Sequence, residues 1–349
     1  MPIIYNPIDF RGKAAEPVIE ELLLENSTLG NDIVTFADNV KANTIFTESK
    51  AGVVQQALVT SGSPTTKGEL GAFDSIVSPV QIEYYVDFDW NVLRNSRFIP
   101  KPGAWELLST EFEQVVIGGL YAKKISLNAE FNFWNNVKAT TKTAIAGLTA
   151  GTAQTSVGAK EKTLIAATTI GDVEGNVSGL YDGVIAKMIY NNSNAALAYG
   201  VGQRVKVDGT TITSANIKAE YDKLYAAIPV EALNAERNGS ELLIYAPYSH
   251  KQLISIFNND PANYKNAFAG DVKSGYSFNG IKIVYVPIPV NVMIVGSKER
   301  FYWCTDLLSD VNYLQVEKHA SPRKDYFIDA VMTAEAHVTN QKYNVLYVG

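Results

Sequence analysis

The clearest pattern in the chain is an alternation of apolar and polar residues between Val80 and Trp90. Valine, isoleucine, tyrosine, phenylalanine and tryptophan occupy every second position, and most positions between them carry Gln, Glu or Asp. Because successive side chains of a strand point to opposite faces of its sheet, this pattern predicts a long antiparallel strand that is buried on one face only.

A helical pattern follows Pro102 and Gly103. Between Trp105 and Phe133 apolar residues recur at spacings of three and four, so the sequence predicts a helix over residues 104–134. At about 1.5 Å per residue this helix would be roughly 45 Å long, longer than most helices of globular proteins. Weaker patterns predict helices over residues 16–43 (two to three turns, then a less regular continuation), 179–190, 214–228 (capped by Ser214 and stopped by Pro229) and 248–258.

Residues 47–75 combine one short apolar run, Val53 to Val59, with many Ser, Thr, Gly and Pro residues. This composition predicts a long, open β-hairpin with its tip near residues 62–68, too polar to carry a core of its own. Residues 1–16 contain three prolines or glycines and few periodic apolar positions, which indicates an extended arm. Such an arm is usually ordered by a neighbouring chain.

The remainder of the chain is predicted to be mixed. Residues 139–178 are rich in Thr, Ala and Gly and are predicted to form loops and short strands. A hairpin is predicted over residues 201–212, and further strands over residues 242–246, 281–287, 292–295, 301–303, 310–316, 326–338 and 343–348. The fold class predicted from these elements is α+β.

Composition limits the possible functions. The chain has 349 residues, is 46% hydrophobic and carries a formal net charge of −6, so it can bury a substantial core but shows no basic footprint for gripping nucleic acid. No run of about 18 apolar residues or secretory signal is present, which predicts no membrane association. The single cysteine, Cys304, lies in an aromatic context typical of a buried thiol.

The residues that carry chemistry in other proteins are scattered here. Asp87 and Asp89 form the solvated face of the predicted strand, and Ser249 beside His250 lacks the turn that presents a nucleophile. The three histidines, including His319 and His337, show no metal-ligand spacing, and no phosphate-binding loop is found. The sequence therefore predicts no catalytic residue, no cofactor and no metal site.

The order of elements resembles that of tailed-bacteriophage major capsid proteins with the Hong Kong 97-type fold. Three segments carry the resemblance: the arm, hairpin and strand before the long helix; residues 221–229 followed by 242–250, which are similar to a helix-strand-helix unit; and residues 280–287 with 303–307 and the terminal strands. The resemblance covers nearly the whole chain.

The resemblance implies a division of the chain. Residues 1–16 would be the N-terminal arm and residues 44–79 the extended loop. Residues 139–290 would form the axial domain. The peripheral domain would consist of residues 17–43, 80–138 and 291–349, with its spine helix at 104–134.

The implied function is that of a virion protein rather than an enzyme. Copies would assemble in the bacterial host cytoplasm into homo-pentamers and homo-hexamers of an icosahedral head enclosing double-stranded DNA without sequence-specific binding. Scaffold, portal and possibly decoration proteins would be partners. Residues expected to contact other subunits, on the arm and hairpin, are Tyr5, Phe10, Val53, Leu58, Lys67 and Phe73.

Two departures from the family and three alternatives remain. Some relatives begin with a cleaved scaffolding segment, whereas Met1 starts directly at the arm, which implies a separate scaffold or another assembly route. Others crosslink a hairpin lysine, and Lys67 has a suitable position without an identifiable partner. The alternatives are an encapsulin-type nanocompartment shell, a β-rich surface or adhesion protein, and an enzyme built on residues 139–290.

Overall fold

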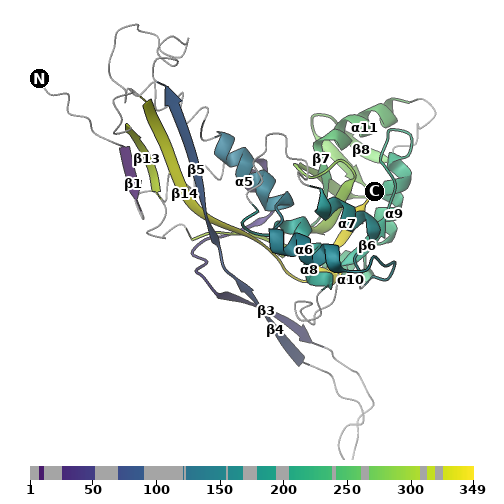
Figure 1. The fold of residues 1–349 in the computed structure, drawn as a ribbon. Coiled ribbons are helices and arrows are strands. Elements are labelled where there is room, and N and C mark those ends of the chain that lie inside the picture. The colour runs from purple at the N-terminus through teal and green to yellow at the C-terminus, as the bar shows by residue number, and fades with distance from the viewer. Residues whose placement is uncertain are drawn as a thin grey trace, which may run out of the picture.

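The computed structural model describes residues 8–11, 26–51, 70–89, 121, 123–154, 156–167, 179–193, 204–237, 241–260, 267–306, 313–318 and 325–349. Two sheets with packed helices form the body, and a two-stranded ribbon projects away from it (Figure 1).

A six-stranded sheet is organised around one long strand, β14. Along one path the strands are β1 (Ile8–Arg11), β13 (Tyr313–Lys318), β14 (Asp325–Val338), β12 (Phe301–Cys304) and β2 (Thr35–Ala37), and β5 (Val80–Asp89) also pairs with β14. β5 runs antiparallel to β14 over its whole length. The long antiparallel strand predicted from the alternating pattern is therefore confirmed, but Val86, on the face predicted to be buried, is exposed.

The seven-stranded sheet contains both parallel and antiparallel neighbours. Its order is β6 (Val205–Asp208), β15 (Val345–Val348), β11 (Val292–Ser297), β7 (Leu242–Pro247), β10 (Ile281–Val286), β9 (Gly275–Phe278) and β8 (Phe268–Asp271). In β7, Leu243 and Tyr245 enter one hydrophobic core, whereas Leu242 and Ile244 enter another. A sheet covered on both faces needs nearly continuous apolar strands, which is the pattern of β7 and β11.

Two groups of helices cover the two faces of this sheet. The first core includes residues of α5 (Lys123–Asn135), α6 (Ala139–Gly147), α7 (Ala159–Ala166) and α8 (Val184–Ser193). The second includes residues of α9 (Ile217–Ala226), α10 (Val230–Arg237) and α11 (Tyr248–Asn259). The short helix α2 (Ser27–Gly30) contributes to the first core, and two 3-10 turns span Lys298–Arg300 and Gln341–Tyr343.

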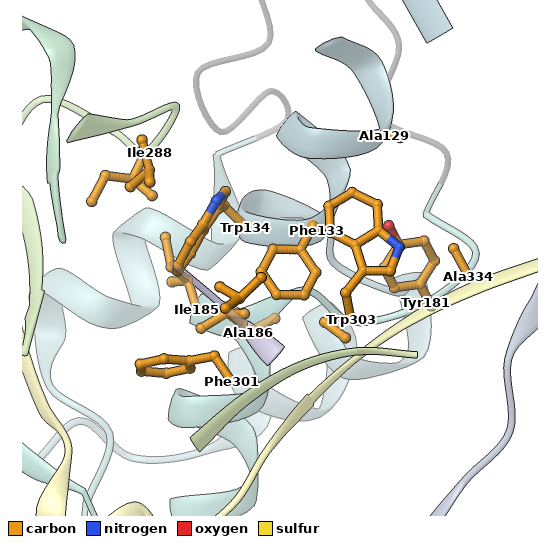
Figure 2. Close-up of a cluster of buried hydrophobic side chains, with 14 of the residues drawn as sticks. Ala129, Phe133, Trp134, Tyr181, Ile185, Ala186, Ile288, Phe301, Trp303 and Ala334 are labelled. Carbon is orange, nitrogen blue, oxygen red and sulfur yellow. The ribbon is translucent and has the colours of Figure 1, made fainter. Parts of the chain in front are cut away.

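Aromatic side chains join the two sheets in the first core (Figure 2). Phe133 of α5 stacks on Trp303 of β12, with ring centroids 4.7 Å apart. The adjacent Trp134 packs against Tyr245 of β7 at 5.2 Å, and its indole nitrogen donates to the Thr28 hydroxyl at 3.0 Å. One turn of α5 therefore contacts both sheets and fixes them relative to each other.

The outer edge of β6 is blocked by a side chain. The amide group of Gln154 accepts from the Lys206 backbone N–H at 2.6 Å and donates to the Lys206 carbonyl at 3.1 Å. It thus imitates a neighbouring strand at this position. An exposed strand edge is a template for uncontrolled pairing, and Gln154 closes part of this one.

Residues 139–178 were predicted to form loops and short strands, and that prediction is wrong over the described part. Helices α6 and α7 occupy it. Each buries only two side chains one turn apart, Thr141 with Ile145 and Glu161 with Ile165. Alanine and lysine favour helix without producing an apolar stripe, so the periodicity was too weak to detect.

Other boundaries also differ. The hairpin predicted over residues 201–212 is wrong, because β6 pairs in parallel with β15 near the end of the chain. Helix α9 begins at Ile217, after Ser214. Helix α10 and the β8–β9 hairpin were not predicted. Of the predicted helix 104–134, residues 123–134 are confirmed as part of α5, whereas 104–120 lie outside the described residues.

The sheets divide the chain differently from the predicted domains. β11 and β15 fall within residues 291–349, which were assigned to the peripheral domain with the strands of the six-stranded sheet, yet both lie in the seven-stranded sheet. Within the predicted arm, residues 8–11 pair antiparallel with β13 of the same chain. This part of the arm therefore pairs with a strand of the same chain.

Candidate inter-subunit surface

The ribbon consists of β3 (Thr44–Ala51) and β4 (Leu70–Val77), paired antiparallel along their whole length. This is the stem of the predicted hairpin, and residues 52–69 lie outside the described residues. β3 and β4 form a sheet of their own and pair with no other described strand. A two-stranded ribbon is marginal in water by itself, so this one needs support at its root or along its faces.

One face of the ribbon is anchored to the body at its root. Phe46 packs on Tyr302 at 5.3 Å and on His337 at 4.9 Å between ring centroids. The Ser75 hydroxyl lies 3.0 Å from Nε2 of His337, and Val77 is buried with Cys304. The root is therefore held by aromatic packing, a buried hydrogen bond and a small apolar cluster.

A charged pair reinforces the root where β4 leads into β5. Glu335 of β14 accepts from the Ser78 backbone N–H at 2.7 Å and pairs with Lys187 of α8 at 2.5 Å. Glu335 and His337 are two residues apart on one strand, so both face the ribbon. The direction in which the ribbon leaves the body is set by these contacts.

The opposite face of the ribbon carries an apolar pair in solvent. Ile45 and Ile76 lie directly across from each other in the ladder, and their exposed fractions are 57% and 62%. The next pair on this face is polar, with the Thr47 hydroxyl donating to Asp74 at 2.7 Å. Two opposed isoleucines on a projecting ribbon leave apolar surface exposed to solvent, and we call them the Ile45–Ile76 pair.

The residues predicted to contact other subunits remain mostly untested. Tyr5, Val53, Leu58 and Lys67 lie outside the described residues. The backbone of Phe10 pairs with Leu314, and the backbone of Phe73 pairs with Glu48. Sequence reasoning missed Ile45 and Ile76, because their common face becomes apparent only when the register of the ladder is known.

The groups considered for catalysis have structural partners instead. Nδ1 of His250 faces the Tyr221 hydroxyl at 3.1 Å and Nε2 donates to the Val290 carbonyl at 2.9 Å, so the imidazole does not serve Ser249. Burial raises the pKa of the Cys304 thiol to about 12, which keeps it protonated.

Nowhere among the described residues do three His, Cys, Asp or Glu side chains gather in a way that could hold a metal ion. None of the described helices is long and apolar enough to cross a lipid bilayer.

Burial of two histidines makes stability depend on pH. Burial lowers the pKa of His250 to about 4 and that of His337 to about 3, against about 6.5 in an unfolded chain. As pH falls below 6.5 these histidines become protonated in the unfolded chain but stay neutral in the folded one. Folding stability therefore falls by up to roughly 1.4 kcal/mol per pH unit for each histidine until its folded pKa is reached.

We expect this loss in the purified protein between pH 6.5 and about 4. The measurement is a set of urea titrations across that range, comparing the natural chain with His337→Gln. The variant lacks one titrating imidazole, so its free energy of unfolding should fall less steeply with acid. Parallel curves for the two proteins would show that His337 is not the buried neutral group described above.

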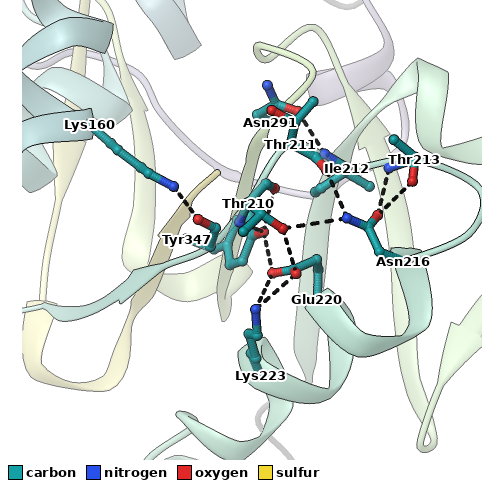
Figure 3. A network of polar contacts seen from close by, with 11 residues as sticks. Lys160, Thr210, Thr211, Ile212, Thr213, Asn216, Glu220, Lys223, Asn291 and Tyr347 are labelled. Atoms are coloured by element: carbon teal, nitrogen blue, oxygen red, sulfur yellow. Dashed lines mark hydrogen bonds and ion pairs between the residues drawn. The ribbon is translucent and has the colours of Figure 1, made fainter.

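A polar network closes one end of the seven-stranded sheet (Figure 3). Glu220 of α9 accepts from the hydroxyls of Tyr347 at 2.7 Å and Thr210 at 2.8 Å and from the Lys223 ammonium at 2.9 Å. Burial alone would raise the pKa of Glu220, but these three hydrogen bonds lower it to about 2. The network ties α9, β15 and the chain after β6 together.

Replacing Tyr347 with Phe is expected to destabilise the subunit by about 1–3 kcal/mol, since Glu220 loses a donor and the Thr210 N–H loses its acceptor. Urea denaturation of the purified subunit measures this. Tyr343→Phe is the matched control and should cost less than about 0.5 kcal/mol. Equal losses in both variants would mean that the Tyr347 hydroxyl contributes nothing specific.

Comparison with solved structures shows which known fold the chain shares. No protein-family model matches the chain, and no curated protein matches its sequence. Among solved structures, the capsid of an empty GTA particle is 11% identical with a TM-score of 0.51, covering 94% of this chain and 90% of that one. The capsid of the native GTA particle gives 10% and 0.50 with the same coverage.

The procapsid of satellite phage P4, in a structure that includes the size determination (Sid) protein, matches at 13% identity and a TM-score of 0.49, covering 96% of this chain and 98% of that one. The two GTA capsids carry the assignment, and at such low identity they establish the fold alone. The chain therefore has the mixed helix-and-sheet fold of a capsid subunit, as the resemblance to tailed-phage capsid proteins implied.

Proposed function

We propose that this chain is the major capsid protein of a tailed bacteriophage, a structural subunit without catalytic activity. Copies would form pentamers and hexamers, and these would form an icosahedral head around double-stranded DNA. The observation that carries the proposal is the projecting ribbon with its exposed Ile45–Ile76 pair, in a chain that has a capsid fold.

The Hong Kong 97-type parts can be assigned as part of this proposal. The ribbon would be the extended loop, and α5 the end of the spine helix. The six-stranded sheet would form the peripheral domain, and the seven-stranded sheet, with β11 and β15 included, the axial domain. Residues 1–16 would remain the arm, with β1 as its attachment to the parent subunit.

The physical argument rests on the ribbon. Ordering its residues costs conformational entropy, and the packing described above anchors the ribbon at its root. A second copy that covers the Ile45–Ile76 pair would remove the exposed part of two large apolar side chains from water, worth roughly 1–2 kcal/mol each. Many such modest contacts, repeated in a closed shell, add up by multivalency.

Charge fits the same role. A net charge of −6 does not favour tight binding of the shell protein to DNA. Weak binding suits a capsid, because the DNA has to move past the shell protein during packaging. Scaffold, portal and decoration proteins would be partners during assembly in the host cytoplasm, and the finished location would be the virion capsid. An encapsulin-type compartment shares the shell role and differs in what it encloses.

The test is to purify the chain, concentrate it and image it by negative-stain electron microscopy. The proposal predicts closed, uniform shells. After expression with the neighbouring phage genes, nucleic acid inside the shells would indicate a phage head, whereas enclosed protein would indicate an encapsulin-type compartment. A protein that stays monomeric at every concentration, with and without those genes, would refute the shell function.

A further inference from the structure

An apolar groove lies beside the end of the seven-stranded sheet. It is lined by Lys160, Thr163 and Leu164 of α7, by Pro289 and Val290, and by Val348. Its volume is about 350 Å³. The Val290 wall is fixed, because the Val290 carbonyl accepts from the buried His250. A preformed apolar groove of this size fits a few side chains of a partner.

An apolar side chain projects from the opposite edge of the same sheet. Val272, 47% exposed, lies in the turn that joins β8 to β9. The turn is rigid, because the Asp271 carboxylate accepts from the backbone N–H groups of Lys273 at 2.7 Å and Ser274 at 2.6 Å. A valine held outward on such a turn costs little further entropy when it enters a pocket.

The groove and the turn lie at the same end of the sheet. β7, β10, β15 and β6 run parallel, so Val286 and Val348 end at one level, where the groove lies. β9 and β10 are antiparallel, with Ile281 opposite Phe278 and Lys282 opposite Ser277. The same register continued by two residues places Gly275 opposite Val284. The turn before Gly275 therefore lies near the same end of the sheet. β15 and β8 are five strand spacings apart, roughly 24 Å.

We infer that the Val272 turn of one copy inserts into the Leu164–Val290 groove of the next copy around a ring. This inference rests on the proposed function and names the contact that joins axial domains. The Val272 turn and the Leu164–Val290 groove are different surfaces on opposite edges of one sheet. Contact between them would therefore be heterologous and would form a ring rather than a twofold dimer. The charges of Asp271 and Lys273 in the turn balance, and the Lys160 ammonium donates to the Gly209 carbonyl of its own chain, so apolar packing of Val272 would hold the contact.

Engineered cysteines test the contact directly. The native Cys304 is buried, so it gives little background. Subunits carrying Val272→Cys are mixed with subunits carrying Thr163→Cys under assembly conditions, oxidised and analysed on non-reducing gels. We expect a heterodimeric disulfide from this mixture, and a ladder of higher species from the variant that carries both substitutions on one chain.

The control replaces Val272→Cys with Val230→Cys, which is also an exposed valine, at 67%, and should not crosslink to Thr163→Cys. A second measurement compares Val272→Asp with Val230→Asp in folded subunits, verified by circular dichroism. The first should weaken association roughly tenfold or more, and the second should leave it unchanged.

Particles that form normally without the heterodimeric crosslink, or with crosslinks between two Val272→Cys chains, would overturn this inference while the shell function stands. An intramolecular crosslink in the double variant would overturn it as well. Failure of the natural chain to form any particle would instead refute the proposed function.

Discussion

Replacing Ile45 with Asp and Ile76 with Lys is expected to yield a folded subunit that does not assemble. Both side chains are more than half exposed, so the subunit loses little of its own core. The two new charges lie opposite each other in the ladder and attract, which preserves the ribbon. An apolar contact with another copy would have to bury these charges, and the penalty recurs at every equivalent contact of a shell.

Sedimentation velocity and electron microscopy measure assembly, and circular dichroism verifies the fold. Ile256→Asp is the matched control, because Ile256 lies on α11 away from the ribbon and has the same exposed fraction as Ile45, 57%. Shells of normal size and yield from the double variant would show that the Ile45–Ile76 pair is not an assembly contact.

Arg204→Met is expected to destabilise the subunit by about 3–5 kcal/mol, the usual cost of leaving one partner of a buried ion pair alone. The Arg204 guanidinium and the Glu161 carboxylate pair with both side chains fully buried. Glu161 also accepts from the Gly158 backbone N–H at 2.8 Å at the start of α7. Without Arg204 this carboxylate stays in the interior with only neutral donors.

Urea denaturation gives the free energy of unfolding for a short series. Arg204→Met combined with Glu161→Gln should recover much of the loss, because the amide can still cap Gly158 and carries no charge. Lys218→Met removes a partner of the exposed Lys218–Asp222 pair and should cost less than about 1 kcal/mol. Equal effects from Arg204→Met and Lys218→Met would contradict a buried charge pair.

Elements with strong local patterns were predictable from the sequence. Each such pattern is recognisable within a dozen residues. Examples are the alternation in β5, the strand β7 followed by α11 after Pro247, and the apolar runs of β10 and β11. They are also the elements whose side chains enter the two large cores. Hydrophobic patterning reports burial, so it finds what is deeply buried.

The missed elements depend on distant partners. β6 is stabilised by β15, which follows it by some 140 residues, and no local signal reveals a parallel pairing of that range. α6 and α7 are held by a few buried side chains and by lysines, such as Lys162, whose ammonium donates to the Ala146 carbonyl at 3.0 Å. Such contacts leave no period in the sequence.

The candidate surface was predictable only in part. The polar composition of residues 47–75 indicated a hairpin without a core, and the paired stem is present. Which residues face outward was not predictable, since Ile45 and Phe46 are neighbours of similar hydrophobicity and the two faces are distinguished by distant contacts such as the packing of Phe46 on His337. The contacts predicted from the sequence therefore lie elsewhere on the arm and hairpin.

The most direct test of the shell proposal is a cryo-electron microscopy reconstruction of particles assembled from the natural chain, at a resolution that traces β3 and β4. The ribbon is predicted to lie on a second subunit, with Ile45 and Ile76 covered by it. A ribbon that folds back on its own subunit, or that extends into solvent with both isoleucines uncovered in every copy, would contradict the account.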